Sequence, residues 1–309
     1  MLQTFNEKNR DLIVNINGKL VHRDEAGVSP FDSAVQNGDA VWEGLRVYPQ
    51  GIFKLQEHID RLEKSAAMLQ YAGVPDRSKI LHEVYRTLSA NNMQSDVHIR
   101  LTVSRGLKYT SGLDPRINTK GCSLIVLAEH KPPVYDKTGI RLITAVHRRP
   151  ARCVLDQRIH SSNQLTSILA KLEANAADAD DALMLDTRGY LAETNATHVF
   201  QVKDGVVETS TCNACPEGIT RATVLDICRR NNIPCNERDI PHRELFEADE
   251  LFCTGTMGEL VHVLSLDNQP IGMGNQSESQ PGPMLNRLNE LFAREVEIGC
   301  TPLEELNAE

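Results

Sequence analysis

Apolar and polar residues follow two different periods along the first 130 residues, and the two periods predict strands and helices in one unit. Alternation at every second position marks a half-buried strand, whereas spacing of three or four marks an amphipathic helix. Apolar runs flank Asn-Gly in 12–21, which is a strong hairpin signal. Residues 40–55 predict two strands around Pro-Gln-Gly, and further strands are predicted at 97–106 and 123–130.

Two amphipathic helices are predicted among these strands, at 57–73 and 80–92. In the first of them Ile59, Leu62 and Ala66 share one helical face. Strands, two helices and then strands indicate a small α+β domain over residues 1–130.

The segment 131–139 is the predicted linker between two domains, because it holds two prolines and a glycine. A larger domain is expected over 140–309, since a chain of 309 residues is long enough for two domains. It begins with a predicted strand at 140–148, and short paired strands and two further helices follow. The predicted helix at 164–177 has an apolar stripe made of Leu165, Ile168, Leu169 and Leu172.

Charge and apolar runs restrict the partners of this chain. Its formal net charge is −9 and its basic residues are scattered, which argues against nucleic acid. No apolar run approaches the roughly 20 residues that span a bilayer, and the N-terminus lacks the pattern of a secretory signal. A cytoplasmic protein without a membrane partner is therefore the expectation.

Eight cysteines are present, and only Cys212 and Cys215 have the spacing of a metal or redox pair. A zinc site would require a second pair of ligands, and no such pair is evident, so no metal is predicted. A reversible disulfide and two ordinary loop cysteines remain the alternatives.

Three features of the sequence could bind a phosphate group. The stretch 216–225 begins a helix with Thr220 as the predicted N-cap, and a helix start offers free N–H groups to an anion. The small-residue turn 253–259 offers further N–H groups, and Arg61 offers a guanidinium. Either backbone feature alone is typical of an ordinary cap or turn. Glu193, at a strand end, would suit a protonated ring nitrogen if it lined a pocket.

Seven stretches of the chain resemble the fold-type IV pyridoxal-phosphate enzymes, the group of branched-chain and D-amino-acid aminotransferases and 4-amino-4-deoxychorismate lyase. The stretches follow the family's order from residue 38 to about 263. They are "GDAVWEGLRVY", "EHIDRLEKSA", "HIRLTVSRG", "SNQLTSILAKLEAN", "DALMLDTRGYLAET", "EGITR" and "ADELFCTGTMGELVHV". The resemblance implies the two-domain α+β and α/β fold of the D-amino-acid aminotransferase type, and a homodimer.

The resemblance also implies roles for particular residues. Glu193 resembles the glutamate that hydrogen-bonds the pyridine nitrogen and keeps it protonated. The residues that resemble the phosphate site are Arg61, Gly218, Ile219, Thr220, Gly255 and Thr256. The residues that fall where the family binds substrate are Trp42, Arg46, Arg100, Met257 and Gly258. For Trp42 a core position, and for Arg100 an ordinary ion pair on a strand, remain alternatives.

The chain departs from the family at its Schiff-base lysine. That lysine lies in a segment like "xIKSxN", and here "RIHSSN" places His160 at its position. No lysine occurs between Lys137 and Lys171, so a shift of one residue in the alignment cannot restore it. An imidazole can move protons near neutral pH, but only a primary amine forms a stable Schiff base with the cofactor aldehyde.

The resemblance therefore predicts that pyridoxal 5′-phosphate or pyridoxamine phosphate, if bound, is held non-covalently, with His160 as a base. A second departure is Pro216, where the family often has a leucine that packs on the cofactor ring.

Four functions remain open. The chain is an aminotransferase-like enzyme with slow or altered chemistry, a binding protein without catalysis, an enzyme that uses His160 without pyridoxal phosphate, or an ordinary aminotransferase whose lysine was substituted. The implied reaction is amino-group transfer between an amino acid or amine and a 2-oxo acid.

Overall fold

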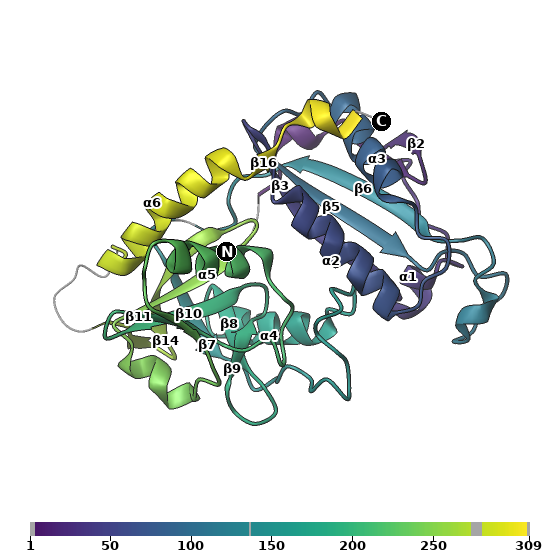
Figure 1. The fold of residues 1–309 in the computed structure, drawn as a ribbon. Coiled ribbons are helices and arrows are strands. Elements are labelled where there is room, and N and C mark those ends of the chain that lie inside the picture. Colours follow the sequence, from purple (N-terminus) through teal and green to yellow (C-terminus); the bar gives the residue numbers. More distant parts are fainter. Residues whose placement is uncertain (1–3, 136, 273–279, 308–309) are drawn as a thin grey trace. The chain divides into compact units, whose positions relative to one another are not determined.

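The computed structural model describes residues 4–135, 137–272 and 280–307, and the chain divides into two compact units (Figure 1). The N-terminal unit comprises Leu2–Pro132 together with the segments Ile159–Asn163 and Val296–Glu309. The C-terminal unit comprises Pro133–Arg158 and Gln164–Glu295. Both units combine strands and helices, which confirms the predicted α+β and α/β fold class. The division at residues 130 and 140 stays a prediction, and residue 136 of the expected linker lies outside the described residues.

The N-terminal unit is built on one antiparallel sheet of seven strands, in the order β16-β4-β3-β5-β6-β1-β2. Its strands are β1 (Ile13–Ile16), β2 (Lys19–His22), β3 (Ala40–Tyr48), β4 (Gly51–Phe53), β5 (Val97–Ser104), β6 (Ser123–His130) and β16 (Cys300–Thr301). Its helices are α1 (Ser33–Asn37), α2 (Leu55–Met68), α3 (Arg77–Ala90) and the 3-10 turns η1 (Glu7–Asn9), η2 (Pro115–Ile117) and η4 (Leu303–Asn307).

The predicted hairpin at 12–21 is confirmed, with Asn17 and Gly18 between β1 and β2. Both turn residues have positive φ, at 54° and 80°. Asn and Gly tolerate this conformation better than other residues, and it matches the twist of the paired strands.

The predicted helices of this unit are also confirmed, and α2 and α3 lie over the sheet (Figure 1). Ile59, Leu62 and Ala66 of α2 are buried in one core with the inward-facing residues of β3, β5 and β6. The helix ends at Met68, five residues before the predicted end, and the next residue but one, Gln70, has φ of 55°. The other helix starts after Asp76, whose side chain accepts a hydrogen bond from Lys79 N.

The C-terminal unit contains a nine-stranded mixed sheet, in which eight strands follow the order β12-β11-β10-β13-β14-β7-β8-β9 and β15 pairs with β14. Its strands are β7 (Ile140–Thr144), β8 (Asp181–Leu185), β9 (Leu191–Thr194), β10 (His198–Lys203), β11 (Val206–Thr209), β12 (Cys235–Glu237), β13 (Glu250–Gly255), β14 (Glu259–Leu266) and β15 (Gln269–Pro270). Its helices are α4 (Leu165–Ala176), α5 (Ile219–Arg230) and the 3-10 helix η3 (His242–Glu247), and α6 (Pro283–Ile298) begins in it.

The predicted strand at 140–148 ends earlier, at Thr144. The side chain of Asp267 accepts hydrogen bonds from both the backbone N–H and the hydroxyl of Thr144, and the chain leaves the strand there. In the part of the chain that the structure describes, no helix is both long and apolar enough to cross a membrane.

Three of the four residues of the apolar stripe predicted on α4 are exposed, and the fourth, Leu169, is half-buried. Leu165, Ile168 and Leu172 have exposed fractions of 66%, 55% and 57%. The helix instead packs a face of small residues, Ala170 and Ala174, in a core with residues of β8. Close packing of alanines on the sheet leaves the larger side chains outward.

Candidate functional site

The segment that carries His160 belongs to the N-terminal unit and runs beside the start of β3. Trp42 N donates to His160 O at 3.0 Å, and Ser162 N donates to Ala40 O at 2.8 Å. The indole N–H of Trp42 donates to the backbone oxygen of Ser161 at 3.0 Å. These bonds fix His160 next to the strand although 118 residues separate it from Trp42 in sequence.

The imidazole of His160 stacks on the Trp42 ring, with the centroids 4.4 Å apart, and its side chain is 13% exposed. Its Nδ1 lies 2.6 Å from the backbone oxygen of Trp42. A carbonyl oxygen only accepts hydrogen bonds, so we infer that Nδ1 carries the hydrogen and that Nε2 has the lone pair. The guanidinium carbon of Arg100 lies 3.3 Å from the centroid of the Trp42 ring, which is a close cation–π contact.

A buried carboxylate, Glu43, organises the polar groups around this histidine. Arg61 donates to it twice, from Nε at 2.8 Å and from Nη2 at 2.6 Å. His58 Nδ1 lies 2.7 Å and His160 Nδ1 lies 3.4 Å from its oxygens. A bidentate guanidinium–carboxylate pair of this kind has a fixed geometry, so Arg61 is held in place.

Opposite charges set the protonation states in this cluster. Burial raises the pKa of Glu43, but Arg61 and His160 outweigh burial and hold that pKa well below its ordinary value. Burial and the neighbouring Arg61 lower the pKa of His160, against the opposing effect of Glu43. His160 is therefore a neutral imidazole at neutral pH.

The structure thus brings Trp42, Arg61, Arg100 and His160 together, while Arg46 lies farther along β3 and stacks on Tyr48. Sequence reasoning missed Glu43 and His58. The signal for Glu43 was present, because it is a charged residue in the inward-facing phase of a strand that is otherwise apolar there.

One face of the sheet in this unit is rich in cations. Arg46 and His98 are cross-strand partners on β3 and β5, and Arg100 follows two residues after His98. Burial, together with Lys131 and the two arginines, lowers the pKa of His98 to about 3. This face carries Trp42, Arg46 and Arg100, the three substrate residues predicted in this unit. Alternate residues of a strand share a face, and Arg100 lies opposite Gly44, between Trp42 and Arg46.

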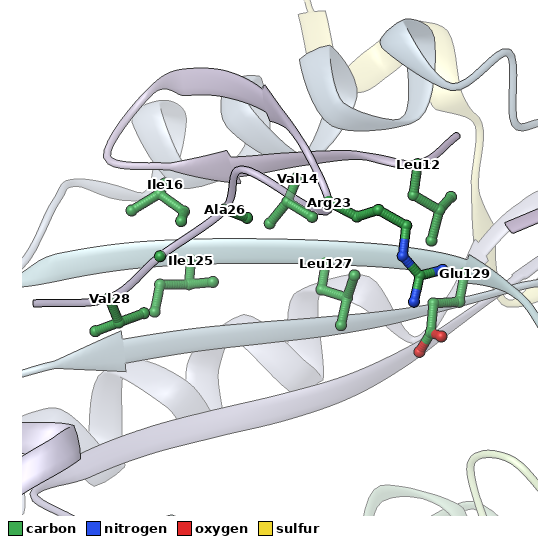
Figure 2. Close-up of a pocket in the computed structure, with 10 residues that line it drawn as sticks. Leu12, Val14, Ile16, Arg23, Ala26, Val28, Ile125, Leu127 and Glu129 are labelled. Carbon is green, nitrogen blue, oxygen red and sulfur yellow. The ribbon is translucent and has the colours of Figure 1, made fainter. Parts of the chain in front are cut away.

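A pocket of about 310 Å³ lies farther along the same sheet, where β1 and β6 pair (Figure 2). Figure 2 shows the aliphatic side chains of both strands beneath the segment 23–28, with Arg23 and Glu129 at one end. None of the predicted site residues lines it.

In the C-terminal unit, Glu193 on β9 is buried and forms an ion pair with Arg149, whose Nε lies 2.9 Å from Oε1. Arg149 also donates to the backbone oxygen of Thr194 at 2.9 Å. His198 Nδ1 lies 4.0 Å from the other carboxylate oxygen of Glu193. The predicted ring partner is therefore a buried carboxylate beside a fixed cation, not a solvent-facing residue.

The start of α5 corrects one prediction. The N-cap is Gly218, not Thr220, which lies at the second helical position. No side chain caps this end, so the first N–H groups of the helix are not occupied by a capping residue. A Cβ on Gly218 would lie 2.3 Å from His198 Nε2, so close approach of the backbone requires glycine here.

The turn after β13 packs on the same segment. A Cβ on Gly255 would lie 3.0 Å from Cγ2 of Thr197, the residue before His198. Gly218 and Gly255 therefore both pack against the segment 193–198, which begins with Glu193.

The end of this turn packs on a different part of the unit. Met257 O accepts a hydrogen bond from Val134 N at 3.1 Å, and Gly258 lies against the ring of Tyr135. Sequence reasoning missed Arg149, Thr197 and His198, because their roles depend on strand pairing and not on a local pattern.

Lys171, the next lysine after His160, also belongs to the C-terminal unit. Its Nζ donates to the backbone oxygen of Asp180 and lies 3.5 Å from Oδ1 of Asp181. These contacts give this amine a structural role at the end of α4.

Comparison with known proteins identifies the family of this chain. Residues 40–266 match the family of amino-transferase class IV. The chain is 46% identical over 297 residues, 96% of its length, to branched-chain-amino-acid aminotransferase-like protein 2 of Arabidopsis thaliana, and spans 52% of that relative. It is 32% identical over 289 residues to D-alanine aminotransferase of Bacillus licheniformis, covering 92% of this chain and 96% of the relative.

A solved structure extends the match to three dimensions. The T.th. branched-chain amino acid aminotransferase, complexed with N-(5′-phosphopyridoxyl)-L-glutamate, superimposes with a TM-score of 0.84 at 31% identity. The match covers 96% of this chain and 97% of that chain. This chain belongs to the class IV aminotransferases.

Proposed function

We propose that this chain binds pyridoxal 5′-phosphate or pyridoxamine phosphate without a covalent bond. We propose further that His160 moves protons in a transfer of amino groups between an amino acid or amine and a 2-oxo acid. The observation that carries the proposal is the 2.6 Å contact from His160 Nδ1 to the backbone oxygen of Trp42, which leaves Nε2 as the basic nitrogen.

The residues of each unit fit such a cofactor. The uncapped start of α5 and the small residues at Gly218 and Gly255 suit a phosphate group that needs close approach to backbone N–H groups. Glu193 is an acceptor that Arg149 keeps in place, which suits a protonated ring nitrogen. The related T.th. enzyme was solved with a phosphopyridoxyl compound.

The roles we propose follow from these features. Ile219 and Thr220 bind the phosphate through the start of α5, and Gly255 and Thr256 bind it through the end of β13 and the turn that follows. Glu193 holds the ring nitrogen. When bound, the cofactor supplies an electron sink next to the substrate carbon that loses its proton.

His160 is suited to one of the two tasks that a lysine performs in such enzymes. Burial and Arg61 keep its ring neutral, so it can accept a proton at Nε2 and return it elsewhere. It cannot supply a primary amine, so nothing at this position ties the cofactor covalently. We therefore expect slow or altered turnover and a cofactor that dissociates.

We propose that the substrate is a carboxylate-bearing amino acid or its 2-oxo acid, or an amine. Arg46 and Arg100 share one face of the sheet with Trp42, and arginine is well suited to bind a carboxylate. The whole protein's substrates remain a proposal, because the chain spans about half of its Arabidopsis relative.

We also propose a homodimer. The stripe formed by Leu165, Ile168 and Leu172 on α4 is exposed, and contiguous exposed apolar side chains mark interaction surfaces. A two-fold axis beside α4 would let the same stripe meet its copy.

The decisive experiment compares the wild type with His160→Lys after incubation with pyridoxal 5′-phosphate and reduction with borohydride. We expect the wild type to keep its mass and to lose the cofactor on gel filtration. The variant should gain the mass of one phosphopyridoxyl group and transaminate at least about tenfold faster, because a primary amine can form the Schiff base that imidazole cannot. His147→Lys, a histidine exchanged on the surface, is the matched control and should stay unlabelled at that position.

Three outcomes discriminate among the functions. Covalent cofactor in the reduced wild type would show that another lysine captures it and would refute non-covalent binding. Cofactor binding without turnover in both proteins would favour a binding protein, a reading supported by the second departure at Pro216. Turnover that persists in His160→Ala would remove the proposed base.

A further inference from the structure

Two thiols lie side by side in the loop that leads into α5. Cys212 and Cys215 are both free, and each thiol shifts the pKa of the other, so the two side chains are neighbours. The Cys215 thiol donates to the backbone oxygen of Thr211 at 3.8 Å. Residues 212 and 213 form a turn, which brings residues three apart close together. Cys212 is partly exposed, whereas Cys215 is fully buried.

The surroundings distinguish the two thiols chemically. The neighbouring Cys215 thiol and Arg221 lower the pKa of Cys212, against the effect of burial. The Cys212 thiol and burial raise the pKa of Cys215 well above its ordinary value. The more exposed thiol is thus the better nucleophile, and the buried thiol is shielded from reagents.

Arginines fix the loop on both sides of this pair. Arg152 Nη2 donates to the backbone oxygen of Cys212 at 3.1 Å. Arg221, at the third position of α5, donates to the backbone oxygen of Ser210 at 2.5 Å and to Glu237 at 2.6 Å. Both thiols are therefore held near one another in a loop of defined shape.

We propose that Cys212 and Cys215 form a redox site that low-molecular-weight disulfides oxidise reversibly. In the first step the Cys212 thiolate attacks one sulfur of the external disulfide, forms a mixed disulfide and releases one thiolate. In the second step the sulfur of Cys215 attacks Cys212, and its proton passes to the departing sulfur, which leaves as the second thiol. Two protein thiols are oxidised and one external disulfide is reduced to two thiols.

A second thiol pair in the same unit provides an internal comparison. Cys228 of α5 and Cys235 of β12 are neighbours, and burial, together with the Cys235 thiol, raises the pKa of Cys228 to about 12. The charges of Arg229 and Arg287 do not outweigh this burial. In both pairs the two thiols are close together. A faster reaction at Cys212 and Cys215 would therefore be due to the lowered pKa of Cys212 and not to proximity.

Oxidation of Cys212 and Cys215 should affect cofactor binding, because the pair lies just before the start of α5; this expectation rests on the proposed function. Cys215 stands three residues before Gly218, the N-cap of α5, and lies close enough to Glu193 to feel its charge. A disulfide between 212 and 215 restrains the backbone that enters the phosphate site. We expect oxidation to weaken the binding of pyridoxal 5′-phosphate at least threefold.

The test treats the full chain with glutathione disulfide and maps its thiols by peptide mass spectrometry. We expect a 212–215 disulfide to form at least tenfold faster than a 228–235 disulfide and to disappear with dithiothreitol. Equal rates for the two pairs, or a pair at 212–215 that stays reduced while the exposed Cys153 is glutathionylated, would overturn the proposal.

Variants then separate the two steps. Cys215→Ala should accumulate glutathione on Cys212, whereas Cys212→Ser should leave Cys215 unmodified, and Cys153→Ser should behave as the wild type at both positions. Modification of Cys215 in Cys212→Ser would refute the assigned order.

Titration with pyridoxal 5′-phosphate in both redox states tests the coupling. Equal affinity in the two states refutes the coupling, and a reduced protein that does not bind the cofactor refutes the proposed function while leaving the disulfide measurement intact.

Discussion

At the scale of single residues, one buried carboxylate determines the state of a whole cluster. Glu43 is fully buried, yet it stays charged because Arg61 forms a bidentate pair with it and His58 lies at hydrogen-bond distance. Burial and the Arg61 cation of this pair lower the pKa of His160, against the opposing effect of Glu43, and keep that histidine neutral. A change at Glu43 therefore affects both the stability of the protein and the proposed base.

Removing the charge of Glu43 leaves Arg61 buried without its counterion, and breaking a buried pair in this way is strongly destabilising. We expect Glu43→Gln to lower the free energy of unfolding by about 3–5 kcal/mol, measured by urea denaturation. Asp114→Asn is the matched control, because it breaks the exposed pair with Arg116 and should leave stability nearly unchanged. A loss of similar size in both variants would refute the importance of burial.

His98 gives the protein a predictable sensitivity to acid. Its pKa is lowered to about 3 in the folded protein by burial and by Lys131, Arg100 and Arg46, and is about 6.5 when unfolded. Between these values the unfolded chain binds more protons, so stability is present above pH 6.5 and falls as the pH is lowered towards 3.

We expect His98→Gln to lose stability less steeply than the wild type, by up to about 1.4 kcal/mol per pH unit, between pH 6 and pH 4. Urea titrations across this range measure both slopes, and the difference at pH 8, where the wild-type ring is neutral, gives the packing contribution. Parallel curves from pH 8 to pH 4 would contradict the lowered pKa.

At the scale of elements, the start of α5 shows how two parts of the chain constrain one glycine. Gly218 has an ordinary φ of −65°, so its backbone conformation is open to other residues. Space is the limiting factor, because the imidazole of His198 occupies the position where a Cβ would lie.

Gly218→Ala should therefore lower the free energy of unfolding by about 1–3 kcal/mol, the range for overpacking, and weaken phosphate binding. Gly27→Ala, where no atom lies within 4 Å of the added Cβ, is the neutral control. In a His198→Ala background the same substitution should be less destabilising, because the clash is removed. Equal losses in both backgrounds would mean that the clash is not the cause.

At the scale of the whole molecule, the exposed stripe on α4 is the feature on which the proposed homodimer rests. Its small face packs on β8 and its large apolar side chains remain outside. Leaving such a stripe in water is unfavourable by about 25 cal/mol for each Å² of apolar surface. A second copy that covers the stripe removes this contribution.

Charges on the stripe should separate the copies. We expect Ile168→Lys combined with Leu172→Lys to convert a dimer into a monomer in sedimentation or light-scattering measurements. Ile298→Asp, which changes an apolar residue that is 75% exposed on α6, should leave the oligomeric state as it is. A wild type that is monomeric at micromolar concentration would refute the proposed homodimer.

Local patterns predicted most elements of both units. The hairpin at Asn17 and Gly18 and the face of Ile59, Leu62 and Ala66 follow from turn conformation and helical period, which neighbouring residues determine. The wrong N-cap at Thr220 has a different origin. Sequence preference favours a hydroxyl residue at an N-cap. The helix instead begins after Gly218, two residues before Thr220, at a position where the ring of His198 leaves no room for a Cβ.

The sequence by itself determined the fold class, the order of the elements and the presence of a histidine where a lysine is expected, because period, turn chemistry and residue identity are local properties. Only the tertiary structure decided that Glu43 and Arg61 surround His160, that Arg149 holds Glu193, and that the stripe on α4 faces outward. Those relations depend on which distant segments pair and pack, since burial and electric charge act through space and not along the chain.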